Sequence, residues 1–209
     1  MPKVHVVRHG HVHNPDKVLY GRLPGFVLSD AGEAMAQAVA EHFVATGADV
    51  ARVVASPLTR AQQTAAPIAA VFGLEIDTDE RLIEAANDYE GSPIQSGAKD
   101  FIHPRNWWRL RNPWRPSWGE PYALQRDRMW AAIYDAAAAT PERETVMVSH
   151  QLPIWVARTA FEQRSFFHDP RSRECALGSV TTFTIEDGVA TGMDYATPAS
   201  GIEVTGGTP

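Results

Sequence analysis

Short apolar runs, separated by longer segments with helical periodicity, set the pattern of this chain. Four runs are rich in β-branched residues and read as buried strands. They cover Val4–Val7, Arg52–Ala55, Thr145–Val148 and, with clearer alternation, Ser179–Ile185. Asp187-Gly188 is a turn signal directly after the fourth run, which we predict to be the final strand. A further small strand is expected at Leu74–Asp77.

Apolar residues at helical spacing lie between these runs and predict helices. The expected helices run from Ser29-Asp30 to Gly47, from Pro57 to Gly73, from Pro121 to about Ala139, and through Ile154 to Phe161. Pro67 should kink or divide the second helix. Alternating strands and helices predict an α/β fold, a three-layer sandwich whose mostly parallel central sheet has helices on both faces.

The 209 residues suffice for one sizeable domain, and we assign residues 1–200 to it. Residues 201–209 are expected to form a disordered tail. An irregular insertion at about 92–120 mixes prolines and glycines with arginines and with tryptophans at Trp107, Trp108, Trp114 and Trp118. We interpret it as a cap that selects part of a substrate. The alternatives are a packing lid with outward arginines and a platform for nucleic-acid bases.

Composition narrows the classes of function. The chain is 44% hydrophobic and 21% charged, and its net charge of −6 argues against a general binder of nucleic acid or acidic membranes. Cys175 is the single cysteine, which excludes an internal disulfide and a cysteine-rich zinc site. No stretch approaches the roughly 20 apolar residues of a membrane span, and no signal pattern is seen. We expect a cytoplasmic protein without a membrane partner.

Polar residues follow three of the predicted strands. These are Arg8-His9-Gly10, Ser56 through Arg60, and Ser149-His150. The carboxyl ends of parallel strands meet at one edge of a sheet, so two arginines and two histidines could share one pocket. Guanidinium groups match phosphate through paired donors, and the following helix N-termini add backbone N–H groups. The pattern predicts a phosphate site.

An imidazole in a phosphate site can act as a nucleophile on phosphorus, while nearby positive charge stabilises the transferring group. A leaving alkoxide also needs a proton from an acid. Glu84 has the best position for this acid, with Asp88 and Glu90 as competitors.

Three alternate histidines could instead suggest a metal site, because alternate strand residues share a face. These are His9, His11 and His13. Gly10 breaks the strand, however, and Asp16 is the one carboxylate nearby. We therefore predict no metal site, and we place His11 at the rim of the pocket.

Five segments in order carry a family resemblance. They are Val6-Val7-Arg8-His9-Gly10, Leu28-Ser29-x-x-Gly32, Ser56-Pro57-Leu58-x-Arg60-Ala61-x-x-Thr64-Ala65, Gly119-Glu120-Pro121 and Val148-Ser149-His150. Together they resemble the motifs of the histidine phosphatase superfamily, also called the phosphoglycerate mutase-like family, over roughly residues 3–190. After the first motif the family often has Glu, then Ser or Thr, where this chain has His11-Val12.

The resemblance implies a fold, an activity and a set of site residues. His9 would be phosphorylated during turnover, and Glu84 would be the acid. The transferring group would be held by Arg8, Asn14, Arg60 and His150. The family requires no metal, and the resemblance implies no other cofactor.

We therefore expect a metal-independent phosphomonoester hydrolase with a small-molecule substrate, working through a phosphohistidine at His9. A phosphoglycerate mutase is the enzymatic alternative, but the Glu-Arg-His-Tyr-Gly type of segment seen in mutases is absent, which favours hydrolysis. The alternative from another class of function is a protein without catalytic activity that binds a phosphate ligand or has a regulatory role. We expect no nucleic-acid partner. The identity of the substrate and the oligomeric state, a homodimer included, stay open.

Overall fold

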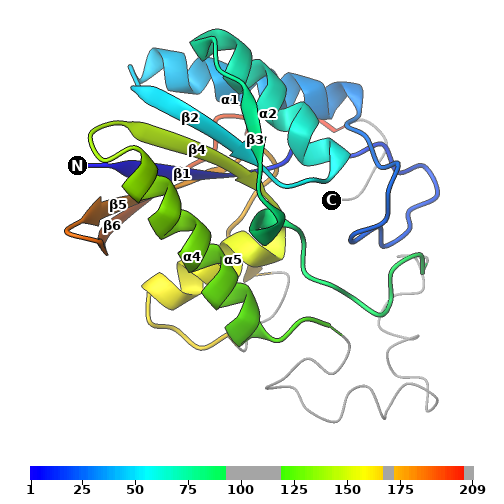
Figure 1. The fold of residues 1–209 in the computed structure, drawn as a ribbon. Coiled ribbons are helices and arrows are strands. Elements are labelled where there is room, and N and C mark those ends of the chain that lie inside the picture. The colour runs from blue at the N-terminus through cyan, green and yellow to red at the C-terminus, as the bar shows by residue number, and fades with distance from the viewer. Residues whose placement is uncertain (93–118, 167–171, 205–209) are drawn as a thin grey trace.

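The computed structural model describes residues 1–92, 119–166 and 172–204, which build a six-stranded sheet between two layers of helices (Figure 1). The strands are β1 Lys3–Arg8, β2 Val50–Ala55, β3 Ile76–Thr78, β4 Glu144–Ser149, β5 Val180–Glu186 and β6 Val189–Ala196. Their order across the sheet is β3-β2-β4-β1-β5-β6. The first four in this order pair in parallel, whereas β5 pairs antiparallel with both β1 and β6. The sheet is mostly parallel, as predicted.

Helices cover both faces of this sheet. They are α1 Asp30–Ala45, α2 Thr59–Phe72, α4 Tyr122–Ala139 and α5 Gln151–Phe161, with a short 3-10 helix, η1, at Glu80–Leu82. Figure 1 shows α1 and α2 on one face and α4 and α5 on the other. The predicted three-layer sandwich is confirmed.

Each face of the sheet has its own apolar core. Val4 and Val6 of β1 belong to a cluster that includes Met129 of α4, whereas Val7 belongs to a second cluster with Phe43 of α1. Side chains alternate between the faces of a strand, so both sets of β1 residues are buried. Burial on both faces explains why the strands read as almost continuous apolar runs.

The predicted helix ends have clear local causes. The side chain of Ser29 accepts the N–H of Gly32 at 3.2 Å and caps α1. Gly73 adopts φ 64° after α2, a left-handed conformation that ends helices and suits glycine.

Pro67 does not divide the second helix, contrary to one alternative of our prediction, because α2 continues from Thr59 to Phe72. A proline removes one backbone hydrogen bond and crowds one carbonyl within the helix. The fully buried Ile68 and the neighbouring Ala65 anchor the same turn in the core shared with α1. Tertiary packing therefore offsets the local cost.

The prediction that the strand near Ser179–Ile185 is the last was wrong, because β6 follows the turn at Asp187-Gly188 and pairs with β5. The residues of β6 are exposed or half-buried, and Gly192 lies within it. An edge strand of this kind lacks the apolar run by which a buried strand is recognised. The small strand predicted at 74–77 is also displaced, to Ile76–Thr78.

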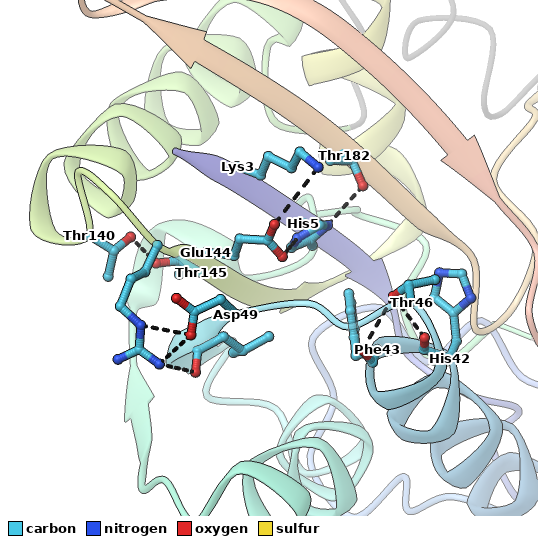
Figure 2. A network of polar contacts seen from close by, with 12 residues as sticks. Lys3, His5, His42, Phe43, Thr46, Asp49, Thr140, Glu144, Thr145 and Thr182 are labelled. Atoms are coloured by element: carbon cyan, nitrogen blue, oxygen red, sulfur yellow. Dashed lines mark hydrogen bonds and ion pairs between the residues drawn. The ribbon is translucent and has the colours of Figure 1, made fainter. Parts of the chain in front are cut away.

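A buried polar cluster, not predicted from the sequence, joins β1, β4 and β5 (Figure 2). His5, which is 7% exposed, has Nδ1 2.8 Å from Thr182 Oγ1 and Nε2 3.0 Å from Glu144 Oε2. Lys3 lies 3.8 Å from the other oxygen of Glu144. The ring of His5 also packs edge-on against Phe43, with centroids 5.0 Å apart. Both ring nitrogens of this buried histidine are thus satisfied.

The predicted insertion and tail fall mostly outside the described residues, which omit 93–118 and 205–209. The two flanks of the insertion lie side by side, because Gly119 bridges Asn87 and the N–H of Glu120 donates to Ala86 O at 3.1 Å. In the part of the chain that the structure describes, no helix is both long and apolar enough to span a membrane.

Candidate active site

The carboxyl ends of β1, β2 and β4 lie next to one another, because β4 pairs in parallel with both of the other strands. The backbone N–H of His9 donates to Ser149 O at 3.1 Å, and that of Ser56 donates to Val148 O at 2.9 Å. The polar segments that follow the three strands therefore share one site, as their sequence positions predict.

Two histidine rings face each other in this site. The ring centroids of His9 and His150 are 5.1 Å apart, and the residues are 2% and 0% exposed. His150 Nε2 lies 2.8 Å from Ser56 Oγ. Its Nδ1 is buried and has no hydrogen-bond partner among the described residues. One ring nitrogen of His150 is therefore held by Ser56, the residue after β2, while the other has no hydrogen-bond partner among the described protein atoms.

The ring of His9 is oriented by the residue that follows it. Its Nδ1 lies 2.8 Å from the carbonyl oxygen of Gly10. A carbonyl can only accept, so Nδ1 carries the proton and Nε2 carries the lone pair. Nε2 is 3.3 Å from Nε of Arg60, which donates to it. The nitrogen able to attack an electrophile therefore points at a cation.

Arg60 is a guanidinium fixed in the interior, since the residue is 1% exposed. Its Nη2 donates to Gly21 O at 2.7 Å, and its guanidinium carbon lies 4.8 Å from the ring centroid of Tyr20. Tyr20 in turn stacks on Phe26, with centroids 5.1 Å apart. Arg60 is thus held by a carbonyl and an aromatic ring and forms no ion pair among the described contacts.

Arg8, the second arginine among the predicted phosphate ligands, ends β1 beside His9. Its Nη1 donates to the carbonyl oxygen of Cys175 at 2.6 Å. Cys175 itself is buried, and burial raises the pKa of its thiol. This cysteine therefore contacts Arg8 through its backbone carbonyl.

Burial and neighbouring cations keep both imidazoles neutral. Burial is the largest cause that lowers the pKa of His9 well below its usual 6.5, and Arg60 and Arg8 add to it. The pKa of His150 is lowered by burial first and then by His9 and Arg60. A neutral imidazole with a free lone pair is the nucleophilic form.

The three candidate acids have different surroundings in the structure. Burial raises the pKa of Glu84 against the opposing effect of a hydrogen bond from the Ala85 N–H and of nearby Arg60 and Arg8. Glu90 instead accepts the N–H of Arg22 at 2.9 Å, and Asp88 is exposed. The carboxyl group of Glu84 interacts electrostatically with Arg60 and Arg8, the two predicted phosphate-binding arginines, which favours it as the acid. Its catalytic role stays a prediction.

Asn14 forms a turn in the loop after β1. Its Nδ2 donates to Val18 O at 2.9 Å, and its Oδ1 accepts the N–H of Val18 at 3.1 Å. Both ends of the amide are therefore engaged with the loop backbone. Its contact with phosphate stays a prediction.

His11 is part of the loop structure, with Nδ1 2.8 Å from Ser29 Oγ at the N-terminus of α1. The described residues contain no group of three or more His, Cys, Asp or Glu side chains that could hold a metal ion. The placement of His11 at the pocket rim stays a prediction.

Several residues of the site received no role in the sequence interpretation. Thr64 accepts the N–H of Gly10 at 3.1 Å and donates to Arg60 O at 2.8 Å, so it links α2 to the end of β1. Its position one helical turn after Arg60 could have indicated that both side chains lie on the same face of the helix. Tyr20 and Arg22 lie in the long loop after β1, which has no periodicity from which their position could be inferred.

Comparisons with known proteins agree with this geometry. The family model of the histidine phosphatase superfamily (branch 1) matches residues 4–196. The uncharacterized protein Rv0525 of Mycobacterium tuberculosis is 49% identical over 198 residues, which cover 95% of this chain and 97% of the relative.

Solved structures also resemble this chain. YhfR of Bacillus stearothermophilus has a TM-score of 0.75 at 22% identity and covers 91% of this chain and 95% of its own. The mycobacterial glucosyl-3-phosphoglycerate phosphatase Rv2419c has a TM-score of 0.70 at 26% identity, over 87% of this chain and 92% of its own. The phosphoserine phosphatase of Entamoeba histolytica has a TM-score of 0.70 at 20% identity, over 95% of this chain and 100% of its own.

Proposed function

Because this chain belongs to the histidine phosphatase superfamily, we propose that it is a metal-independent phosphomonoester hydrolase that works through a phosphohistidine at His9. The observation that carries the proposal is the setting of His9: a buried ring whose Nδ1 faces Gly10 O and whose Nε2 faces the Arg60 guanidinium, with a lowered pKa that favours the neutral form. A base without a proton beside fixed cations suits attack on an anionic phosphoryl group.

In the first step, the substrate phosphate enters between His9 and the guanidinium groups of Arg8 and Arg60. Nε2 of His9 forms a bond to phosphorus as the bond from phosphorus to the ester oxygen breaks. The hydrogen bond from Nδ1 to Gly10 O stabilises the positive ring that develops. The two arginines and His150 stabilise the charge on the three non-bridging oxygens.

The leaving oxygen needs a proton, and Glu84 supplies it. A carboxyl group of ordinary pKa is ionised at neutral pH, but burial raises the pKa of this one and so preserves some of its acidic form. The carboxylate that remains then takes a proton from water, whose oxygen attacks phosphorus and releases His9 and inorganic phosphate. Glu84 is thereby protonated again, and the cycle closes.

Phosphate release across a panel of metabolite phosphomonoesters, assayed with a chelator present, tests this proposal. Phosphoserine and phosphoglycerate derivatives belong in the panel, because structurally similar phosphatases act on them. We expect release by the wild type and loss of several orders of magnitude in His9→Ala. Isomerisation of phosphoglycerate without net release would contradict hydrolysis. Binding of phosphate esters without any turnover would contradict an enzyme altogether.

A further inference from the structure

Arg22 is bonded to the loop that carries Glu84 at two points. Its side-chain Nε donates to the carbonyl oxygen of Glu84 at 2.6 Å, and its backbone N–H donates to the carboxylate of Glu90 at 2.9 Å. The residue before it, Gly21, approaches the same carboxylate so closely that a Cβ there would lie 2.2 Å from Glu90 Oε1. One residue of the loop after β1 thus holds both ends of the 84–90 segment.

Glu120, at the C-terminal end of the predicted insertion, completes this connection. Its Oε2 accepts Nη2 of Arg22 at 3.0 Å, while Nε and Nη2 of Arg128 reach its two oxygens at 2.8 and 3.0 Å. Arg128 also donates through Nη1 to the carbonyl oxygen of Arg81, in η1 just before Glu84. The side chains of Glu120 and Arg128 are 14% and 15% exposed. A paired, two-point contact of this kind fixes direction as well as distance.

We propose that Arg22, Glu120 and Arg128 form a positioning network that sets where the acid, Glu84, stands relative to His9. The network donates hydrogen bonds to the backbone carbonyl oxygens of Arg81 and Glu84 and contacts no reacting atom. This inference rests on the proposed function. It adds to that function a link between the acid and Glu120, which lies outside the loop that carries Glu84.

The charges explain why the carboxylate of Glu120 is needed. Two guanidinium groups share it, and without its negative charge they would repel each other across a half-buried space. Arg22 would then lose the partner that orients its Nε toward Glu84 O. An acid displaced by about 1 Å can lose much of its effect on the rate, because proton transfer requires hydrogen-bond reach.

The variant Glu120→Gln tests the network through dependence on the leaving group. An alkyl phosphate needs the acid, whereas p-nitrophenyl phosphate releases a stable anion and needs it little. We expect kcat for the alkyl ester to fall about 10-fold more than kcat for the aryl ester. Arg22→Lys, which keeps the charge but loses the paired geometry, should reproduce this split. The matched control is Asp127→Asn, which removes an arginine-paired carboxylate that is 60% exposed, and both rates should stay unchanged.

A second measurement does not depend on activity. The pKa of Glu84 can be followed by carbon-13 NMR of its carboxyl group in the wild type and in Glu120→Gln. If the network holds Glu84 in its buried place, the pKa should fall toward its usual 4.5 in the variant. Equal losses on both esters, or an unchanged Glu84 titration, would overturn the network. A wild type that releases phosphate from no ester of the metabolite panel would refute the proposed function, while a fall in the Glu84 pKa would still support the positioning.

Discussion

At the scale of single residues, one physical cause shifts the pKa of the candidate nucleophile and that of the candidate acid in opposite directions, each toward the neutral form. Burial disfavours the charged form of every group. It therefore lowers the pKa of His9 and His150 and raises the pKa of Glu84. Arg60 and Arg8 strengthen the fall of the two histidine pKa values and oppose the rise of the Glu84 pKa, so they favour release of the Glu84 proton. Such divergent shifts in one pocket are the usual mark of paired acid and base roles.

These shifts predict a bell-shaped dependence of kcat/KM on pH. Protonation of His9 removes the nucleophile, and the lowered pKa places this loss below pH 6.5. Ionisation of Glu84 removes the acid, and the raised pKa places that loss above pH 4.5. With an alkyl phosphate as substrate, Glu84→Gln should abolish the alkaline limb. The ionisation of the substrate phosphate, near pKa 6, should remain in both enzymes as an internal control. An alkaline limb that survives the substitution would assign the acid to another residue.

At the scale of elements, the site depends on how closely α1 approaches the end of β1. A Cβ on Gly32 would lie 2.0 Å from His11 O, and one on Gly10 would lie 2.4 Å from Gly32 O. The N–H of Ser29 also donates to His11 O at 3.0 Å. Two glycines therefore permit a contact between backbones that places the loop carrying His9 against the first turn of α1.

Gly32→Ala should destabilise the protein because the new methyl group meets backbone atoms that cannot rotate away. We expect the free energy of unfolding to fall by about 1–3 kcal/mol, the usual cost of overpacking. Chemical denaturation followed by circular dichroism measures this change. Gly201→Ala is the matched control, since a Cβ there has no atom within 4 Å, and its stability should equal that of the wild type. Equal stability of the two variants would mean that the backbone contact is loose.

Elements with strong local signals could be predicted from the sequence. The cap of α1 at Ser29 and the end of α2 at Gly73 follow from short-range chemistry. The continuity of α2 through Pro67 and the presence of β6 could not be predicted from such local signals. The continuity of α2 depends on burial of the turn around Pro67, and β6 is held by its pairing with β5. Both are tertiary effects that no local pattern contains.

The candidate site likewise contains residues that could be placed from the sequence and residues that could not. The arginine that ends β1, the histidine that follows it and the histidine after β4 could be placed together because parallel strands align their ends. Tyr20, Arg22 and Glu120 could not be placed, since they enter from loops whose paths depend on long-range contacts. Sequence reasoning therefore reached the strand-borne part of the site and missed the groups that hold it.

At the scale of the whole molecule, the two ends of the sheet differ in their polar chemistry. The carboxyl ends of β1, β2 and β4 hold the candidate active site. The polar cluster around His5 lies toward the amino ends of β1 and β4, as Figure 2 shows for Lys3 and Glu144. There, the hydrogen bond from His5 is the largest cause that lowers the pKa of Glu144. Stability and activity should thus respond to pH through different groups.

Glu144→Gln should reduce stability in a pH-dependent way. The lowered pKa means that the folded state favours the carboxylate, so the full contribution is present above pH 4.5 and is lost as pH falls through the folded-state value. At neutral pH we expect a loss of about 1–3 kcal/mol in the free energy of unfolding, typical of a hydrogen bond to a charged group. Denaturation at a series of pH values measures the difference from the wild type. It should shrink in acid, whereas the exposed control Glu142→Gln should show none. A difference independent of pH would contradict the role of the charge.

The central claim, a phosphoryl group carried by His9, is tested most directly by trapping it. The wild type is mixed with a phosphorus-32-labelled substrate, quenched in alkali within one turnover, digested and analysed for the labelled peptide. We predict label on His9 that is stable in alkali and lost in acid, and no label in His9→Ala. Rapid hydrolysis by the wild type without label on His9, or label that persists in His9→Ala, would contradict the account.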